Sequence, residues 1–314
     1  FAGFELPTRV STLDERGSRL WRIASYREEP MEDLTDPTPQ RWLDQDTLPA
    51  EARAALAAER EFALMARHEG VKAAFLEWLE PGATVFGPRP MTVEERYATV
   101  PDAPEEQPLL QWLPEWIVIA GSRELAFISG RWNLSPVGAD QAEDFGQYLS
   151  VWARSGERWR VLADIGTSQP EARPLTPDAT GRMIEARAPR VMMVPDPERL
   201  AAQVEGEFQK LAFRDGYAST LRDRADADVV VLRVGAAATR GVDALTVPEP
   251  FAERGPRIEI TGSAAAASHD FLATWGVMHF DGAADDSDRL AFLRVWQLET
   301  SRWQIIADAF LEMP

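Results

Sequence analysis

A 21-residue segment occurs twice in this chain, and this repetition constrains the fold more than any other feature. GQYLSVWARSGERWRVLADIG at 146–166 aligns without a gap to LAFLRVWQLETSRWQIIADAF at 290–310. An upstream segment, EREFALMARHEG at 59–70, aligns in the same way to EGEFQKLAFRDG at 205–216. Repetition over this distance predicts two diverged copies of one folding unit. The identical positions of the long repeat are, in its first copy, Leu149, Val151, Trp152, Arg158, Trp159, Ala163 and Asp164.

The repeat also predicts how the chain is divided. A length of 314 residues fits two domains. We place an N-terminal extension at 1–48, the first domain at 49–170, a linker at 171–194 and the second domain at 195–314. The extension contains a candidate strand, LWRIASY, followed by the proline-rich EEPMEDLTDPTPQ, which we expect to be irregular. The linker is long for a connection inside one domain, and we expect it to be ordered in part.

Each copy begins with helical patterns and continues with strands. In the first copy, AEARAALAAEREFALMARH is rich in alanine, Gly70 is placed to end that helix, and VKAAFLEWL has the spacing of an amphipathic helix. The segments EWIVIAG, ELAFISGRWNL, GQYLSVWAR and RWRVLADIG then read as strands separated by turns. Helices followed by antiparallel strands predict an α+β domain with helices packed on a curved antiparallel sheet.

The repeated segment itself predicts a β-hairpin. Because side chains alternate along a strand, Tyr148, Ser150 and Trp152 face one way and Leu149, Val151 and Ala153 face the other. Both faces carry large apolar groups, so we expect both to be covered. The helices of the same copy cover one face, and the second copy is a natural cover for the other.

Composition excludes several classes of protein. The net charge of −18 argues against a nucleic-acid partner, since such binding depends on neutralising phosphates. No apolar run is long enough to predict a membrane span. The absence of cysteine excludes disulfides and thiolate catalysis. The chain begins at Phe1 rather than Met, from either a cleaved signal peptide or trimming, and we favour export.

The first copy resembles a known family in several motifs. These are VFGPRPMTVEERY, LLQWLPEWIVIAGSRELAFISGRWNL with its Trp112 and Pro114, and the Tyr-x-x-x-Trp pattern of the hairpin. They resemble bacterial SnoaL-like proteins of the ketosteroid-isomerase-like, nuclear transport factor 2-like superfamily. The resemblance implies two cystatin-like cones, each with a pocket between helices and sheet, and supplies no catalytic residues. The second copy matches more weakly, with Arg224 and Ala225 where the first has Trp78 and Leu79.

Candidate site residues were sought in the first copy. Enzymes of this fold need a carboxylate or histidine base together with a tyrosine or acid that polarises a carbonyl. The candidates are Tyr148, Arg131, Asn133, Asp164, His68 and Trp132. Three of them have a structural alternative. Tyr148 suits a core position, His68 a helix C-terminus, and the recurrence of Asp164 as Asp308 favours a structural hydrogen bond.

The second copy offers weaker signals. His269, Asp270 and His279 lack the short spacing of metal ligands, so we predict no metal site and no cofactor. Four arginines of this copy are interspersed with aspartates, a pattern typical of a solvated surface. They are Arg222, Arg224, Arg233 and Arg240, and the aspartates are Asp223, Asp226 and Asp228.

Two functions remain open on this sequence. The first is a non-catalytic module in which the two copies pack as an intramolecular pseudo-dimer and the first copy keeps a pocket for a hydrophobic small molecule. The alternative is an acid–base enzyme, of the isomerase, dehydratase or cyclase type, acting on a small hydrophobic carbonyl compound in that pocket.

Overall fold

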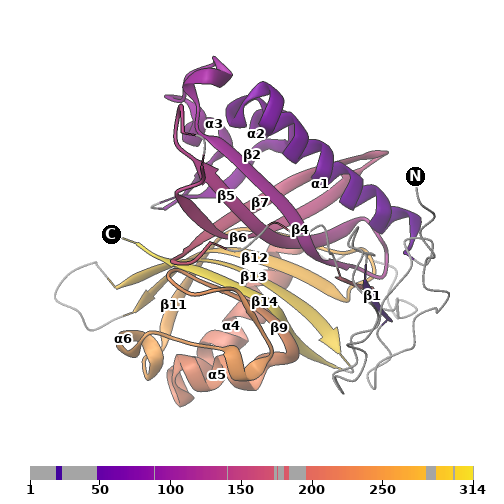
Figure 1. Cartoon of the computed structure of the whole chain (residues 1–314). Helices are drawn as coiled ribbons and strands as arrows, with labels where there is room; N and C mark the ends of the chain where they lie inside the picture. The colour runs from indigo at the N-terminus through magenta and orange to yellow at the C-terminus, as the bar shows by residue number, and fades with distance from the viewer. Residues whose placement is uncertain are drawn as a thin grey trace, which may run out of the picture.

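The computed structural model describes residues 19–22, 48–87, 89–139, 141–172, 175, 180–183, 196–280, 288–299 and 301–313. These residues form four layers, with helices, sheet, sheet and helices in that order (Figure 1). The proline-rich segment at 28–40 and most of the predicted linker lie outside the described residues. Among the described residues, no helix is both long enough and apolar enough to cross a membrane.

The first domain packs its helices on one face of an eight-stranded sheet of order β1-β8-β4-β5-β6-β7-β2-β3. Strands β1 and β8 belong to the predicted extension and linker, and both add to this sheet beyond β4. The helices are α1 (Ala50–Glu69), α2 (Val71–Trp78), α3 (Val93–Tyr97) and the 3₁₀ turn η2 (Pro104–Glu106). The strands are β1 (Arg19–Arg22), β2 (Leu79–Phe86), β3 (Pro90–Thr92), β4 (Leu109–Ile119), β5 (Leu125–Ser135), β6 (Asp144–Ser155), β7 (Arg158–Gln169) and β8 (Thr180–Met183).

The second domain repeats this plan with a six-stranded sheet of order β10-β9-β14-β13-β12-β11. Its helices are α4 (Pro197–Asp215), α5 (Tyr217–Arg224), α6 (Glu249–Ala252) and the 3₁₀ turn η3 (Val242–Ala244). Its strands are β9 (Ala225–Arg233), β10 (Thr239–Arg240), β11 (Pro256–Ala265), β12 (Phe271–Phe280), β13 (Arg289–Glu299) and β14 (Arg302–Glu312).

The predicted fold class is confirmed, with one addition. Each domain contains a four-stranded antiparallel meander, β4 to β7 or β11 to β14. The strand that follows the paired helices lies beside the last meander strand in parallel, β2 against β7 and β9 against β14. Each sheet is therefore mixed rather than purely antiparallel.

The repeated segment is the β6–β7 hairpin in one domain and the β13–β14 hairpin in the other. A bulge interrupts the register between Val151 and Trp152, and an equivalent bulge lies between Val295 and Trp296. Such bulges bend a sheet and increase its twist. The expected alternation holds, because Tyr148 packs in the cluster beneath α1 and α2 while Leu149 packs in the cluster between the sheets.

The two sheets pack face to face, as the apolar outer face of the hairpin predicted. One buried cluster joins residues of both domains, including Phe127 and Val151 from the first and Phe271 and Val295 from the second. Trp275 also donates its indole N–H to Thr84 Oγ1 across the interface at 3.0 Å. Burial of this apolar area holds the two domains together.

A reciprocal contact marks the pseudo-twofold relation between the domains. The Ser122 backbone N–H donates to Ser268 Oγ, and the Ser268 backbone N–H donates to Ser122 Oγ, both at 3.0 Å. The next residues in each turn, Arg123 and His269, both have positive φ, 67° and 59°. When a residue contacts its own equivalent, the interface is isologous, like that of a twofold dimer.

Candidate functional site

The first domain contains a cavity of about 270 Å³ between its helices and the inner face of its sheet. Most of its wall is apolar and aromatic, a composition typical of small-molecule sites. Its polar lining comes from Glu59 on α1, Arg96 on α3, Tyr148 and Ser150 on β6, and Asp164 on β7. The main apolar lining residues are Phe62, Val71, Phe75, Val85, Tyr97, Leu110, Trp112, Trp132 and Leu134.

Glu59, one of the residues that line this cavity, is fully buried. Its two carboxyl oxygens accept indole N–H groups from Trp112 at 2.6 Å and from Trp152 at 2.8 Å. Burial raises the pKa of Glu59 to about 8; the bond from Trp112 opposes the shift, and the nearby Asp164 adds to it. A carboxyl group with this pKa is largely protonated at neutral pH.

Tyr148 and Asp164 lie beside Glu59 on paired strands of the hairpin. Asp164 accepts a hydrogen bond from Ser150 Oγ at 2.5 Å, and burial raises the pKa of Asp164 to about 6. The Tyr148 hydroxyl is buried and makes no hydrogen bond of normal geometry with any described residue. Burial, together with the neighbouring Glu59, raises the pKa of Tyr148. Two carboxyls and a phenol without a hydrogen bond of normal geometry thus line the same cavity.

The candidate residues from the sequence divide into two groups. Tyr148, Asp164 and Trp132 line the cavity. Arg131, Asn133 and His68 do not: Arg131 pairs with Glu115 at 2.7 Å, and His68 is exposed on the last turn of α1. Arg131 and Asn133 flank Trp132 on β5, and alternate residues of a strand face opposite sides.

Glu59 and Ser150 were not among the candidates, although each had a signal in the sequence. Glu59 is a glutamate that both copies keep in the upstream repeat, where it aligns with Glu205. Ser150 lies between Tyr148 and Trp152 on the face that was expected to turn inward. In the long repeat it aligns with Arg294, the least conservative replacement on that face.

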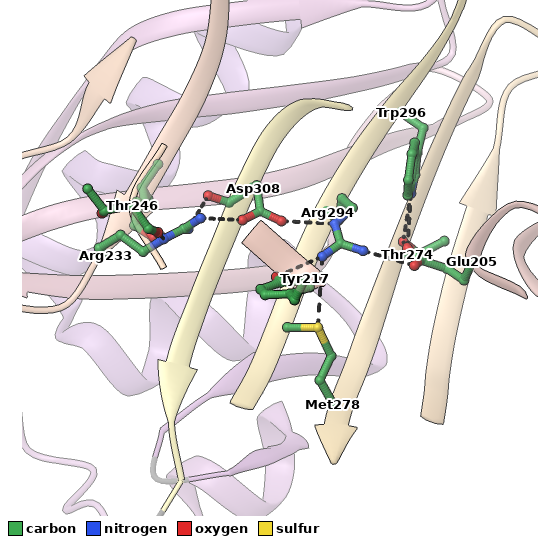
Figure 2. Close-up of polar contacts among 10 residues, drawn as sticks. Glu205, Tyr217, Arg233, Thr246, Thr274, Met278, Arg294, Trp296 and Asp308 are labelled. Atoms are coloured by element: carbon green, nitrogen blue, oxygen red, sulfur yellow. Dashed lines mark hydrogen bonds and ion pairs between the residues drawn. The ribbon is translucent and has the colours of Figure 1, made fainter. Parts of the chain in front are cut away.

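The corresponding space in the second domain is filled by the side chain of Arg294. This arginine is fully buried and bonds Glu205, Asp308 and the Tyr217 hydroxyl (Figure 2). Its Nη1 lies 2.9 Å from Glu205 Oε2, and its Nε lies 2.9 Å from Asp308 Oδ1. Larger side chains replace cavity residues at three further aligned positions, Val71 by Tyr217, Leu134 by Phe280 and Gly166 by Phe310.

In this space between the helices and the sheet of the second domain, two arginines are paired with two carboxylates. Asp308 also accepts from Arg233 Nη2 at 2.6 Å. Burial opposes ionisation of Asp308, but Arg233 and Arg294 outweigh it and lower its pKa. Burial likewise opposes the charge on Arg294, but Glu205 and Asp308 outweigh it and raise its pKa.

One expectation for the second copy needs correction. The arginine and aspartate cluster is not wholly a solvated surface, because Arg233 and Asp226 are both buried. Arg233 was misassigned because its partner, Asp308, is distant in sequence and adjacent only through the parallel pairing of β9 and β14. Although Arg224 and Ala225 stand where the first copy has Trp78 and Leu79, α5 has the same length as α2.

Comparison with known proteins gives structural neighbours only. No protein-family model matches the sequence, and no curated protein is significantly similar to it. An NTF2-like protein of unknown function from Shewanella oneidensis is 16% identical, with 36% of this chain and 96% of that chain covered and a TM-score of 0.30. An NTF2-like protein from Cytophaga hutchinsonii is 16% identical, with coverages of 36% and 93% and a TM-score of 0.29. A domain of unknown function with a cystatin-like fold from Nostoc punctiforme is 16% identical, with coverages of 40% and 81% and a TM-score of 0.31.

Proposed function

We propose that the first domain binds a small, mostly apolar molecule in its cavity and that the second domain is a structural partner without a ligand site. One observation carries this proposal. The first domain keeps an aromatic cavity of about 270 Å³ lined by Tyr148, whose buried hydroxyl lies beside Glu59 without a hydrogen bond of normal geometry, whereas Arg294 fills the corresponding space of the second domain. A buried polar group that its protein neighbours satisfy poorly can be satisfied by a ligand group.

A fragment screen by ligand-observed NMR tests this proposal. Gly166→Phe introduces the residue that aligns in the second domain, Phe310, and it fills the cavity without adding charge. A matched control is Gly206→Phe on α4, where an added Cβ meets nothing within 4 Å. We expect that fragments which bind the wild type and the control will not bind Gly166→Phe. Equal binding to all three proteins would place the fragments elsewhere and overturn the proposal.

An acid–base enzyme is the second candidate, and one observation favours it. Asp164, with a pKa of about 6, lies in the same cavity as the Tyr148 hydroxyl. A carboxylate base and a phenol donor are the groups needed to move a proton beside a carbonyl. Carbonyl fragments that bind are incubated in D₂O, and exchange of their α-protons is followed by NMR. Catalysis predicts exchange that Asp164→Asn and Tyr148→Phe both abolish, and exchange at the buffer rate excludes this activity for those fragments.

A further inference from the structure

The second cone holds an organic cation that belongs to the chain itself. The Arg294 guanidinium lies between two carboxylates, Glu205 and Asp308 (Figure 2). Its central carbon lies 4.4 Å from the centre of the Phe208 ring and 5.5 Å from the centre of the Trp296 ring. Ion pairs and aromatic faces are both standard ways of holding a guanidinium. The second domain therefore shows that a buried cage of two carboxylates and aromatic rings can hold a guanidinium.

The first domain keeps the two carboxyls and two of the aromatic rings of this cage but not the arginine, and Trp112 bonds the second oxygen of Glu59. Glu59, Asp164, Phe62 and Trp152 align with Glu205, Asp308, Phe208 and Trp296, and Ser150 stands where the other domain has Arg294. The strand register agrees with the alignment, because Ser150 pairs with Asp164 as Arg294 pairs with Asp308. The Glu–Trp bond is also kept, from Trp152 to Glu59 and from Trp296 to Glu205.

We propose that the cavity of the first domain binds a small organic cation, a guanidinium or amine with an apolar tail, in the place that the Arg294 guanidinium occupies in the second domain. This inference rests on the proposed binding function and names the class of ligand. A bound cation would supply to Glu59 and Asp164 the positive charge that Arg294 supplies to Glu205 and Asp308. The remaining cavity volume and its aromatic wall accommodate the tail.

The charges around this site agree with a missing cation. The titratable and charged groups that line the cavity are Glu59 on α1, Arg96 and Tyr97 on α3, Tyr148 on β6 and Asp164 on β7. Arg96 is exposed and lies over the Tyr97 ring at 5.5 Å. Burial without a counter-ion raises the pKa of both carboxyls, so a bound cation should favour their ionised forms.

Three probes of similar shape and different charge test the proposal by isothermal titration calorimetry. Benzylguanidine is the cation, benzylurea its neutral analogue, and phenylacetate an anion. We expect benzylguanidine to bind the full chain at pH 8 at least tenfold more tightly than the other two. Its affinity should weaken as the pH falls from 8 to 5, because Glu59 and Asp164 then retain their protons.

Two variants locate the site. Ser150→Arg tethers a guanidinium where the ligand would lie and should abolish benzylguanidine binding, whereas Ser155→Arg, at the exposed end of the same strand, should not. Asp164→Asn keeps the shape of the side chain, cannot be ionised, and should weaken benzylguanidine binding at least tenfold at pH 8. Binding unchanged in both Ser150→Arg and Asp164→Asn would overturn the proposal.

The outcomes also separate this inference from the function on which it rests. Two results would contradict an organic cation as the ligand class while leaving the cavity a ligand site. In one, benzylurea or phenylacetate binds as tightly as benzylguanidine. In the other, neutral fragments bind and none of the three probes does. If Gly166→Phe leaves all fragment binding unchanged, the binding function itself fails.

Discussion

The two cones of this molecule share a buried framework and differ in what occupies the space beside it. In each, a glutamate on the first long helix accepts an indole N–H from the hairpin, and an aspartate lies on the last strand. In the first domain these acids face a cavity, and in the second they face Arg294. A residue kept in both copies thus marks the shared framework, and a residue replaced between them marks where their roles separated.

The largest expected effect comes from removing the internal cation. Arg294→Ser gives the second domain the residue of the first and leaves Glu205 and Asp308 buried beside each other without it. Breaking a buried ion pair costs about 3–5 kcal/mol of the free energy of unfolding, which urea denaturation measures. Arg302→Ser removes an arginine from the exposed pair with Asp223 and should cost less than about 1 kcal/mol. Similar losses of unfolding free energy for the two variants would mean that Arg294 stabilises the second domain no more than an exposed arginine does.

The two domains should respond to pH in opposite directions. In the first, the folded-state pKa values of Glu59 and Asp164, about 8 and about 6, exceed their ordinary values of 4.5 and 3.8. The folded state then binds more protons than the unfolded state, so stability falls as the pH rises. Between pH 5 and pH 7, the titration of Glu59 alone should lower the free energy of unfolding by about 3 kcal/mol, at about 1.4 kcal/mol per pH unit.

In the second domain the sign is reversed. The folded-state pKa of Asp308 lies below its ordinary value of 3.8, so its contribution is present above that value and is lost as the pH falls through the folded-state pKa. Amide hydrogen exchange of α1 and α4, corrected for intrinsic rates, separates the two responses. Between pH 5 and pH 7 the stability reported by α1 should fall as the pH rises while that reported by α4 stays unchanged, and α4 should lose stability only as the pH falls through the folded-state pKa of Asp308. Parallel changes in both helices between pH 5 and pH 7 would contradict the assigned shifts.

Two tyrosine variants compare the contribution of one buried hydroxyl in each domain to stability. Tyr217→Phe removes the acceptor that Arg294 uses at 3.1 Å and should cost about 1 kcal/mol in urea denaturation. Tyr148→Phe removes a hydroxyl that has no firm partner and should leave the ligand-free stability unchanged or raise it by up to about 1 kcal/mol. A loss on Tyr148→Phe equal to that on Tyr217→Phe would mean that the Tyr148 hydroxyl is structurally engaged.

A further pair of variants tests the symmetry between the domains. Ser122→Ala and Ser268→Ala each remove one half of the reciprocal contact at the interface. Each should cost about 1 kcal/mol, and the double variant should cost less than the sum because the two hydroxyls bond each other. Unequal single effects, or full additivity, would contradict an isologous contact. Thermal unfolding of the three variants beside Ser155→Ala gives the measurement.

Much of the fold could be predicted because the repeat reports it locally. The periodic apolar positions of α1 and α2 and the alternation of Tyr148 and Leu149 fix which face of each element is buried. Apolar groups on both faces of the hairpin then require a second cover, which is the other sheet. The parallel pairing of β2 and β9 was not predicted, because these strands pair with strands about 80 residues later in the chain.

The candidate site could be predicted only in part. Tyr148, Asp164 and Trp132 were found because they lie on strands whose inward face was readable. Arg131 and Asn133 lie on one face of β5 and Trp132 on the other, because side chains alternate along a strand, so these three candidates could not all face the cavity. The network around Arg294 depends on contacts between residues 77 to 89 positions apart, for which the sequence carries no local signal.

The contact between Ser122 and Ser268 has a consequence for how this chain could diverge. In a homodimer built through the same contact, every substitution appears in both subunits, so a change that fills one pocket fills the other as well. Joining the two halves in a single polypeptide removes that constraint, because each half then mutates independently. One half could lose its vacant space and gain rigidity while the other retained it, and the surface that binds the halves together could stay the same throughout.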